Sequence, residues 1–295
     1  MRVLVTGAGG QVGSLVAGQL AGHEVLATDR DTFDLTDREN VESVVASFGP
    51  HVIINCAAYT DVDGCERNPD LAYAVNALGV RHLAVASRRI DAHVVHVSTD
   101  FVFDGQLGRP YREWDTPNPL SEYGRSKLGG EQELERHAGS WSIARTAWVY
   151  GDTARDFFSW VVKNYAAGEL RGIADDQYAS PTYALDLAHV LVQLATRRSQ
   201  GVFHVVNAGS SNRWDQGVAA LAALGVDGAA IPRLDSASLN RPAARPLDST
   251  LDSHALTAAG IDPMRKWEDA LRDYVTGPLV ASLEPQVRAA LSERR

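Results

Sequence analysis

Apolar and polar positions follow two different periods over the first half of this 295-residue chain. Short runs of aliphatic and β-branched residues predict strands at Arg2–Thr6, Glu24–Asp29, His51–Asn55 and His93–Val97. Apolar residues with helical spacing predict helices at Ser14–Leu20, at Asp37–Phe48, at Pro69–Ile90 and after Pro119. Strands that alternate with helices in this way are typical of the α/β class.

The pattern is weaker in the second half of the chain. Helical spacing predicts helices at 154–167, Tyr183–Ala195, Trp214–Leu224, Lys266–Tyr274 and Leu279–Leu291. A strand is predicted at Val202–Asn207. Prolines, arginines and serines are mixed between Pro232 and Ser253, so we expect an irregular segment there.

A cluster of glycines separates the first predicted strand from the first predicted helix. The spacing of Gly7, Gly10 and Gly13 is close to that of a dinucleotide-binding turn, in which glycines let a pyrophosphate approach the helix N-terminus. Asp29 ends the second strand, where a carboxylate binds the adenosine ribose of NAD. Because the adjacent Arg30 would meet the 2′-phosphate of NADP, both cofactors stay open.

Chemistry is concentrated between Ser98 and Lys127. Tyr123 and Lys127 are four residues apart in a predicted helix, so their side chains lie on one face. A nearby ammonium favours the phenolate, so we expect Lys127 to lower the pKa of Tyr123 and make it useful in proton transfer. A hydroxyl from the end of the preceding strand, Thr99 or Ser98, would hydrogen-bond a substrate oxygen. A lone Tyr-x-x-x-Lys is most often an ordinary helix face, and the upstream glycine turn favours the catalytic interpretation.

Composition narrows the class of partner. The net charge of −9 argues against a nucleic-acid surface or an anionic membrane surface. We expect no membrane span and no signal peptide, and therefore a cytoplasmic protein, because the first strand begins at Arg2 and no apolar run is long enough. Cys56 and Cys65 have no partner histidine spacing, so neither a disulfide nor a metal site is expected.

Seven motifs in order along the chain resemble the dTDP-4-dehydrorhamnose reductase family, a group of extended short-chain dehydrogenases/reductases. The motifs are the glycine turn Gly7–Gly13, Asp34–Asp37, Asn55–Asp63, Ser98–Gly105, Tyr123-x-x-x-Lys127, Arg145–Gly151 and Asp176–Thr182. A weaker match is the proline-rich segment Arg241–Pro246. The ordered set is far more specific than any single motif.

The resemblance implies a Rossmann-type doubly wound parallel sheet with a smaller C-terminal substrate-binding domain. We expect the dinucleotide-binding domain over residues 1–150 and mainly the substrate domain over 151–295, with elements near 182–207 returning to the first domain. The family reduces the C4 ketone of a dTDP-linked 4-keto-6-deoxy sugar with NADH or NADPH. Thr99, Tyr123 and Lys127 match its catalytic trio, with the tyrosine as proton donor and the lysine also holding the nicotinamide ribose.

Further residues match the family's binding positions. The cofactor contacts implied are Gly7, Gly10, Gln11, Val12, Asp29, Asp34, Leu35, Ala57, Ala58, Tyr59, Tyr123 and Lys127. Asn76, inside the helix predicted over Pro69–Ile90, is a further cofactor-binding candidate. Asp100 and Trp148 match positions that touch the sugar, beside Thr99 and Tyr123. Arg245 would contact the diphosphate or would be a solvated loop arginine.

Several alternatives stay open within and beyond this family. Related 4,6-dehydratases carry a glutamate base where this chain has Phe101, so that activity is set aside. A sugar 4-epimerase, a reductase of another deoxysugar in secondary metabolism and a non-catalytic NADP-binding regulatory subunit remain. A homodimer is compatible with the family. Its metal-bridging glutamate position is Leu15 here, so no metal is predicted.

Overall fold

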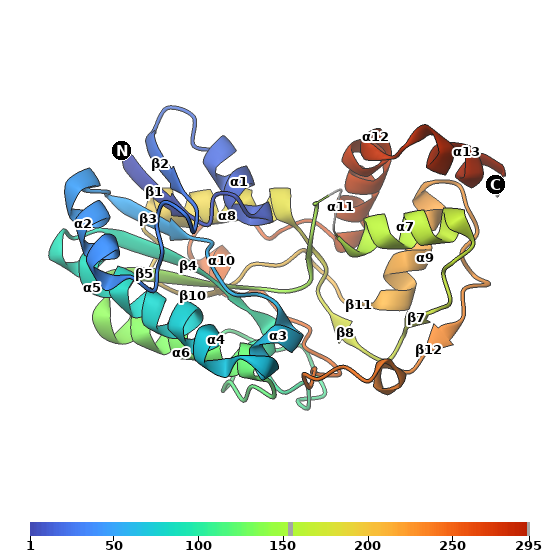
Figure 1. Ribbon diagram of the computed structural model, residues 1–295, viewed down its shortest axis with the longest axis horizontal. Coiled ribbons are helices and arrows are strands. Elements are labelled where there is room, and N and C mark those ends of the chain that lie inside the picture. The colour runs from blue at the N-terminus through green and yellow to red at the C-terminus, as the bar shows by residue number, and fades with distance from the viewer. Residues whose placement is uncertain (153–155, 294–295) are drawn as a thin grey trace.

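Figure 1 shows the computed structural model of the chain, in which residues 1–152 and 156–293 are described. A larger lobe built on a parallel sheet lies beside a smaller, mainly helical lobe. Six parallel strands are arranged in the order β2-β1-β3-β4-β5-β10. Their bounds are β1 Arg2–Thr6, β2 Glu24–Thr28, β3 Val52–Asn55, β4 His93–Thr99, β5 Ser140–Thr146 and β10 Gly201–His204.

Helices cover both faces of this sheet, because alternate strand residues point to opposite faces and both sets are apolar. Val3 and Val5 pack on one face, against α1 (Gln11–Gly18), α8 (Ala184–Arg197) and the short α10 (Ala255–Ala258). Leu4 packs on the other, against α2 (Arg38–Phe48), α5 (Gly79–Arg89) and α6 (Glu122–His137). The doubly wound α/β prediction is confirmed.

Strands β5 and β10, at one side of the sheet, differ from the strands predicted from the apolar periodicity. β5 was not among the predicted strands, because the buried Ser142 and Arg145 interrupt its apolar pattern. β10 comes from the second half of the chain and pairs with β5, with Val202 opposite Ile143. The predicted strand over Val202–Asn207 therefore begins one residue earlier and ends at His204.

The long helix predicted over Pro69–Ile90 is interrupted by a π-helical turn. It consists of α4 (Pro69–Tyr73), the π-helix η1 (Ala74–Leu78) and α5. Asn76 lies inside η1, and its amide bonds both backbone groups of Tyr59 and the hydroxyl of Ser126. A π-turn of this kind re-aims a side chain within a helix.

The smaller lobe contains most of the second half of the chain (Figure 1). Its helices are α7 Phe157–Ala167, α9 Arg213–Ala223, α11 Trp267–Tyr274, the π-helix η4 Val275–Leu279, α12 Val280–Ser282 and α13 Pro285–Glu293. An aromatic group of Tyr150, Phe158, Tyr183 and Tyr274 forms part of its core. The first positions of the helix predicted from residue 154 lie outside the described residues.

Two other predictions for this half differ from the structure. The helix expected over Leu279–Leu291 is broken at Leu283, whose backbone is extended. The segment expected to be irregular contains β12 (Arg233–Leu234), which pairs with β7 (Ile173–Ala174), and the 3-10 helix η3 (Ser236–Leu239). Both strands are two residues long, too short to leave a periodic signal.

The connections of the sheet determine where a ligand can bind. From β1 the chain moves to β2 on one side and then to β3 on the other side of β1. Such a reversal leaves a crevice outside the carboxyl ends of the two strands. The predicted glycine turn follows β1 and therefore opens onto this crevice.

Candidate active site

The glycine turn between β1 and α1 packs tightly against neighbouring backbone. A Cβ added at Gly7, whose φ is +66°, would lie 2.7 Å from the backbone nitrogen of Ala57. A Cβ at Gly13 would lie 2.2 Å from the carbonyl oxygen of Gly7, so neither position accepts a side chain. α1 starts at Gln11 with no side-chain cap from Gly10. These features suit a pyrophosphate bound at the helix N-terminus.

One polar atom beside this turn lacks a protein partner. The Nε2 atom of Gln11 is buried and makes no hydrogen bond to the described residues. A buried amide donor without a partner costs free energy that a bound oxygen would recover. Gln11, with its neighbour Val12 in the first turn of α1, thus fits the predicted role at a diphosphate.

The loop after β2 carries the residues predicted at the adenosine end. Asp29 lies beside the glycine turn and accepts hydrogen bonds from the amides of Asp31 and Thr32. The hydrogen bond from the Thr32 hydroxyl is the largest cause of a lowered pKa at Asp29, so this carboxyl is charged at neutral pH. Arg30 is exposed next to it. A carboxylate and a guanidinium are therefore neighbours in this loop, and the preference for NADH or NADPH stays a prediction.

Two neighbouring candidates are already engaged by the protein. Asp34 accepts from the amide and the hydroxyl of Thr36, which lower its pKa. Leu35 is only 5% exposed, and its carbonyl bonds the ring of His82. Their contact with an adenine stays a prediction.

The loop after β3 forms another wall of the crevice. Ala57 lies against the glycine turn, and its amide donates to Asn55. Ala58 and Tyr59 follow, and Asn76 holds the backbone of Tyr59 from η1. Because Asn76 bonds both backbone groups of Tyr59, this residue shapes the wall. Its direct contact with a cofactor stays a prediction.

The end of β4 and the start of α6 bring the proposed trio together. Thr99 is the last residue of β4, and its hydroxyl donates to Asp100 at 3.0 Å. Tyr123 lies in the first turn of α6 and lines the same cavity as Thr99, whose side chain is close enough to affect the phenol. Gly124 permits this approach, because a Cβ there would lie 2.2 Å from the carbonyl oxygen of Phe101.

The structure distinguishes the two hydroxyls that the sequence left as alternatives. Ser98 precedes Thr99 on β4 and therefore points away from it. Its hydroxyl donates to Glu131 at 2.6 Å in a buried network with Arg145. Thr99, by contrast, lines the pocket together with Tyr123.

The expected effect of Lys127 on Tyr123 is not found. Burial raises the pKa of Tyr123 above that of a free phenol, and the nearby Thr99 side chain opposes this rise. The amine of Lys127 donates instead to the carbonyl of Val97 at 2.7 Å and lies 3.4 Å from Nε2 of His96. Burial lowers the pKa of Lys127 to about 8. The expectation was wrong because burial dominates at Tyr123.

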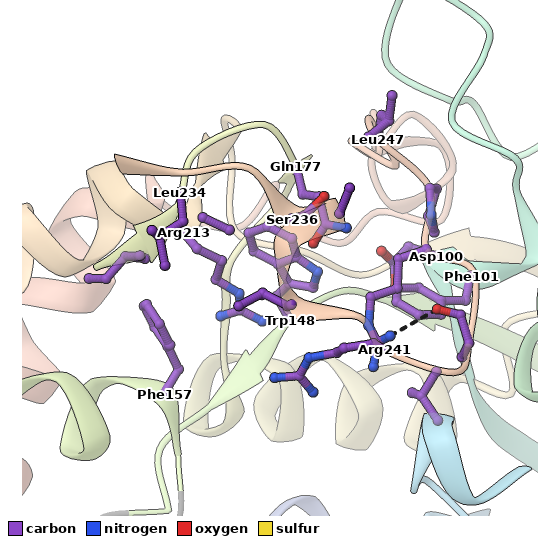
Figure 2. A pocket seen from close by; sticks show the side chains of 18 of the residues that line it. Asp100, Phe101, Trp148, Phe157, Gln177, Arg213, Leu234, Ser236, Arg241 and Leu247 are labelled. Atoms are coloured by element: carbon purple, nitrogen blue, oxygen red, sulfur yellow. Dashed lines mark hydrogen bonds between the residues drawn. The ribbon is translucent and has the colours of Figure 1, made fainter. Parts of the chain in front are cut away.

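A cavity of about 1020 Å³ extends from this trio into the smaller lobe. Figure 2 shows Asp100 and Phe101 on one side of it, Trp148 near its centre and Arg213 with Phe157 on the other side. Gln177 and Ser236 contribute further polar groups. Large aromatic surfaces with a few polar groups between them are typical of a small-molecule site.

Arg213 is among the lining residues of this cavity that sequence reasoning missed. It begins α9, and its guanidinium carbon lies 3.8 Å from the ring centroid of Trp148 and 4.8 Å from that of Phe157. Burial lowers its pKa to about 10, so it still carries its charge at neutral pH. Trp148 is held in the left-handed region at φ +42°, a costly conformation for a bulky residue. No local sequence signal marks Arg213.

Asp100 supplies negative charge close to the trio. It is 2% exposed, and its second carboxyl oxygen accepts from the hydroxyl of Ser249 at 2.6 Å. Burial raises its pKa to about 6, and the hydrogen bonds from Ser249 and Thr99 oppose the rise. Asp100 and Trp148 thus both line the cavity as predicted positions, and their contact with a sugar stays a prediction.

Arg245 is not the solvated loop arginine of the alternative interpretation. Its two terminal nitrogens each lie 3.1 Å from a carboxyl oxygen of Asp63, in α3 (Val62–Arg67). Asp63 also accepts from the amide of Ala243. The pair ties the proline-rich segment to the larger lobe at the wall of the cavity. Diphosphate contact by Arg245 stays a prediction, and Arg241 lines the same wall.

Within residues 1–152 and 156–293, no helix combines the length and apolarity needed to cross a membrane. Over the same ranges no three histidine, cysteine or acidic residues converge as they would to hold a metal ion.

The glycine turn at the switch point of a doubly wound sheet and the Thr-Tyr-Lys group beside it define an extended short-chain dehydrogenase/reductase. A profile of the family described as RmlD substrate binding domain matches residues 1–278. The dTDP-4-dehydrorhamnose reductase of Mycobacterium tuberculosis is 43% identical, over 94% of this chain and 93% of the relative. The chain therefore belongs to the dTDP-4-dehydrorhamnose reductase family.

Other relatives agree with this assignment. The dTDP-4-keto-6-deoxy-D-glucose reductase of Streptomyces niveus is 37% identical, over 92% of this chain and 95% of the relative. Among solved structures, the dTDP-4-dehydrorhamnose reductase of Bacillus anthracis in complex with NADP superposes with a TM-score of 0.88. That structure is 32% identical and covers 93% of this chain and 98% of its own.

Proposed function

We propose that this chain reduces the C4 ketone of a dTDP-4-keto-6-deoxy sugar, and specifically converts dTDP-4-dehydrorhamnose to dTDP-L-rhamnose with NADPH or NADH. The observation that carries the proposal is the meeting of Thr99 and Tyr123 at the wall of the cavity. Family membership supports the substrate class, and the NADP complex of the Bacillus anthracis relative supports the cofactor.

The cofactor would lie along the crevice at the carboxyl ends of β1 and β3. The amides at the start of α1 and the free Nε2 of Gln11 would hold its diphosphate. Asp29 or Arg30 would hold the adenosine ribose, according to whether NADH or NADPH is bound. When bound there, the reduced nicotinamide would supply the hydride.

Tyr123 would give a proton to the oxygen of the reduced C4 carbon. The phenol of Tyr123 is protonated at neutral pH and therefore has a proton to give, while burial makes it a weaker acid than a free phenol. The hydroxyl of Thr99, which donates to Asp100 in the structure, would turn its single proton to the same substrate oxygen when substrate binds and fix its position. Lys127 would keep its amine at the back of this group, where it contacts Val97.

The far half of the cavity would bind the rest of the substrate. The rings of Trp148 and Phe157, which both lie against the guanidinium of Arg213, offer apolar surface. Arg213 and the exposed Arg241 would bind the diphosphate, which needs cations in a chain of net charge −9. Asp100 would accept a hydrogen bond from a sugar hydroxyl.

The decisive test compares Tyr123→Phe with the native protein on dTDP-4-keto-6-deoxy-L-lyxo-hexulose. Loss of absorbance from NADPH, and separately from NADH, reports turnover and the cofactor preference. We expect turnover to fall by roughly 10²- to 10⁴-fold with cofactor affinity retained, as is usual when a general acid is removed. The matched control is Tyr73→Phe, on the exposed surface of α4. Near-normal turnover of Tyr123→Phe would contradict the role of this phenol.

The same assay separates the alternatives. A nucleotide-sugar epimerase would interconvert sugars without net oxidation of the reduced cofactor. A reductase of another deoxysugar would bind both cofactors and respond only to a different 4-keto sugar. If no 4-keto sugar is reduced although the cofactor binds, the chain acts as a non-catalytic partner.

A further inference from the structure

A file of four buried polar side chains runs behind the proposed trio, from β1 to α6. The hydroxyl of Thr6 donates to Oδ1 of Asn55 at 2.6 Å. The amide nitrogen of Asn55 lies 2.9 Å from Nδ1 of His96, and Nε2 of His96 lies 3.4 Å from the amine of Lys127. All four residues are at most 2% exposed. Such a connected file in a dry interior has strong effects on protonation.

The orientation of the Asn55 amide is fixed by a backbone group. The amide N–H of Ala57 is 3.2 Å from Oδ1 of Asn55, and a backbone N–H can only donate. The atom that faces Ala57 must therefore be the oxygen. Thr6 donates to the same oxygen, so the amide nitrogen of Asn55 points to His96 as a donor.

This orientation determines which nitrogen of His96 carries the proton. Nδ1 must accept from Asn55, so the neutral ring carries its proton on Nε2. The doubly protonated ring is disfavoured, because a proton on Nδ1 would point at the N–H donor of Asn55. Burial acts in the same direction and lowers the pKa of His96 well below its usual value. His96 therefore presents a fixed N–H donor toward the amine of Lys127.

We propose that Asn55 and His96 are positioning residues that point a permanent hydrogen-bond donor at Lys127 and thereby favour its neutral amine over its ammonium form. A neutral amine has a lone pair that can accept from Nε2–H, whereas an ammonium has only donors. One of its hydrogens still donates to Val97. The role of this amine in the reaction rests on the proposed function, and its protonation does not.

Other groups that face Lys127 act in the opposite direction. Glu131 and Cys56 both favour the ammonium, although Glu131 lies in an ion pair with Arg145. The thiol of Cys56 is itself neutral, because burial raises its pKa to about 12. The donor from His96 and the buried setting thus counter the carboxylate, so that Lys127 can change its charge near the pH at which the site would work.

The test is Asn55→Asp, an isosteric change in which both carboxyl oxygens accept. The oxygen that replaces the amide nitrogen would draw a proton onto Nδ1 of His96, so that Nε2 becomes an acceptor for the ammonium of Lys127. We expect ¹⁵N spectra of the histidine rings to show neutral, Nε2-protonated His96 in the native protein and Nδ1-protonated His96 in Asn55→Asp. His96→Gln identifies the signal.

The charge of Lys127 is measured by titration of ¹³C-labelled lysine side chains. The chain has only three lysines, Lys127, Lys163 and Lys266, and Lys127→Met identifies the relevant signal. We expect Asn55→Asp to raise the pKa of Lys127 by about one unit or more. Asn55→Asp adds a negative charge and also changes the tautomer of His96. Making Asn55→Asp in a His96→Gln background keeps the charge effect alone, so we expect a clearly smaller rise in the pKa of Lys127 there.

Three results would overturn the proposal. The first is Nδ1-protonated or doubly protonated His96 in the native protein, which needs no variant to fold. The second is an unchanged pKa of Lys127 in a folded Asn55→Asp protein, and the third is an equal rise in both backgrounds. None of these measurements uses turnover. The positioning role of Asn55 and His96 can therefore be refuted while the reductase activity is confirmed, or confirmed while the activity is refuted.

Discussion

The buried ion pair of Glu131 and Arg145 allows a quantitative prediction about the framework of the site. Glu131 lies on α6 and Arg145 on β5, and their side chains are 4% and 5% exposed. One carboxyl oxygen accepts from Arg145 Nε at 3.0 Å and from the hydroxyl of Ser98 at 2.6 Å. The other oxygen accepts from the terminal nitrogen of Arg145 at 2.7 Å. The perturbation is Glu131→Gln.

The cost follows from what Arg145 loses. A glutamine keeps one acceptor oxygen but lacks the negative charge that compensates the guanidinium. Its amide nitrogen, a donor, faces either the guanidinium or the Ser98 hydroxyl. Beyond this pair, the guanidinium of Arg145 donates to the carbonyl of Glu113 at 3.4 Å and lies over the ring of Phe103. Removing one partner of a buried pair costs about 3–5 kcal/mol. We expect the low end, about 3 kcal/mol, because one hydrogen bond is retained.

Urea unfolding followed by circular dichroism measures this free energy. The matched control is Glu42→Gln, which breaks two exposed ion pairs, with Arg38 and Arg89, and should change the unfolding free energy far less than Glu131→Gln does. Removing both charges, by Glu131→Met with Arg145→Met, should cost less than the two single changes together, because no uncompensated charge remains. A loss below about 1 kcal/mol for Glu131→Gln, or strict additivity in the double variant, would refute the reasoning.

Three further predictions concern the walls of the site. Gly13→Ala should abolish tight NADPH binding in a fluorescence titration, because its Cβ would overlap a backbone carbonyl of the turn, whereas Gly18→Ala in the same helix has open space and should bind normally. Asp63→Asn should speed hydrogen exchange in the segment held by Arg245 and raise KM more than it lowers kcat; unchanged exchange would contradict a tethering role. Asp100 has a folded pKa raised from 3.8 to about 6, so the folded state binds more protons between these values and native stability should fall as pH rises from 4 to 6. Asp100→Asn should remove this fall, a difference of about 3 kcal/mol at pH 7 that vanishes below pH 4, and parallel pH profiles of unfolding would contradict it.

Local patterns were sufficient for the framework and for part of the site. The glycine turn could be predicted because strand, turn and helix follow one another directly, and each shapes the next through backbone geometry alone. Tyr123 and Lys127 share a helix face for the same reason. The direction of the tyrosine pKa could not be predicted, because it depends on how much water the fold removes from the phenol.

Groups that meet across long stretches of chain left no signal. Arg213 stacks on Trp148 only because the start of α9 in the smaller lobe meets the segment that follows β5, and nothing near Arg213 in the sequence marks that meeting. Asp63 and Arg245 are 182 residues apart and pair at the wall of the cavity. β5 escaped prediction because its buried polar residues are satisfied by partners on other elements.

By itself the sequence determined the α/β class, the family and the residues of the proposed trio, since these depend on short-range periodicity and on contiguous motifs. Only the tertiary structure decided that Thr99 and not Ser98 faces the cavity, that Arg245 is paired with Asp63, and that His96 lies against Lys127. The physical reason is that burial, ion pairing and tautomer choice depend on which distant groups share one dry space, and that is settled only when the chain has packed.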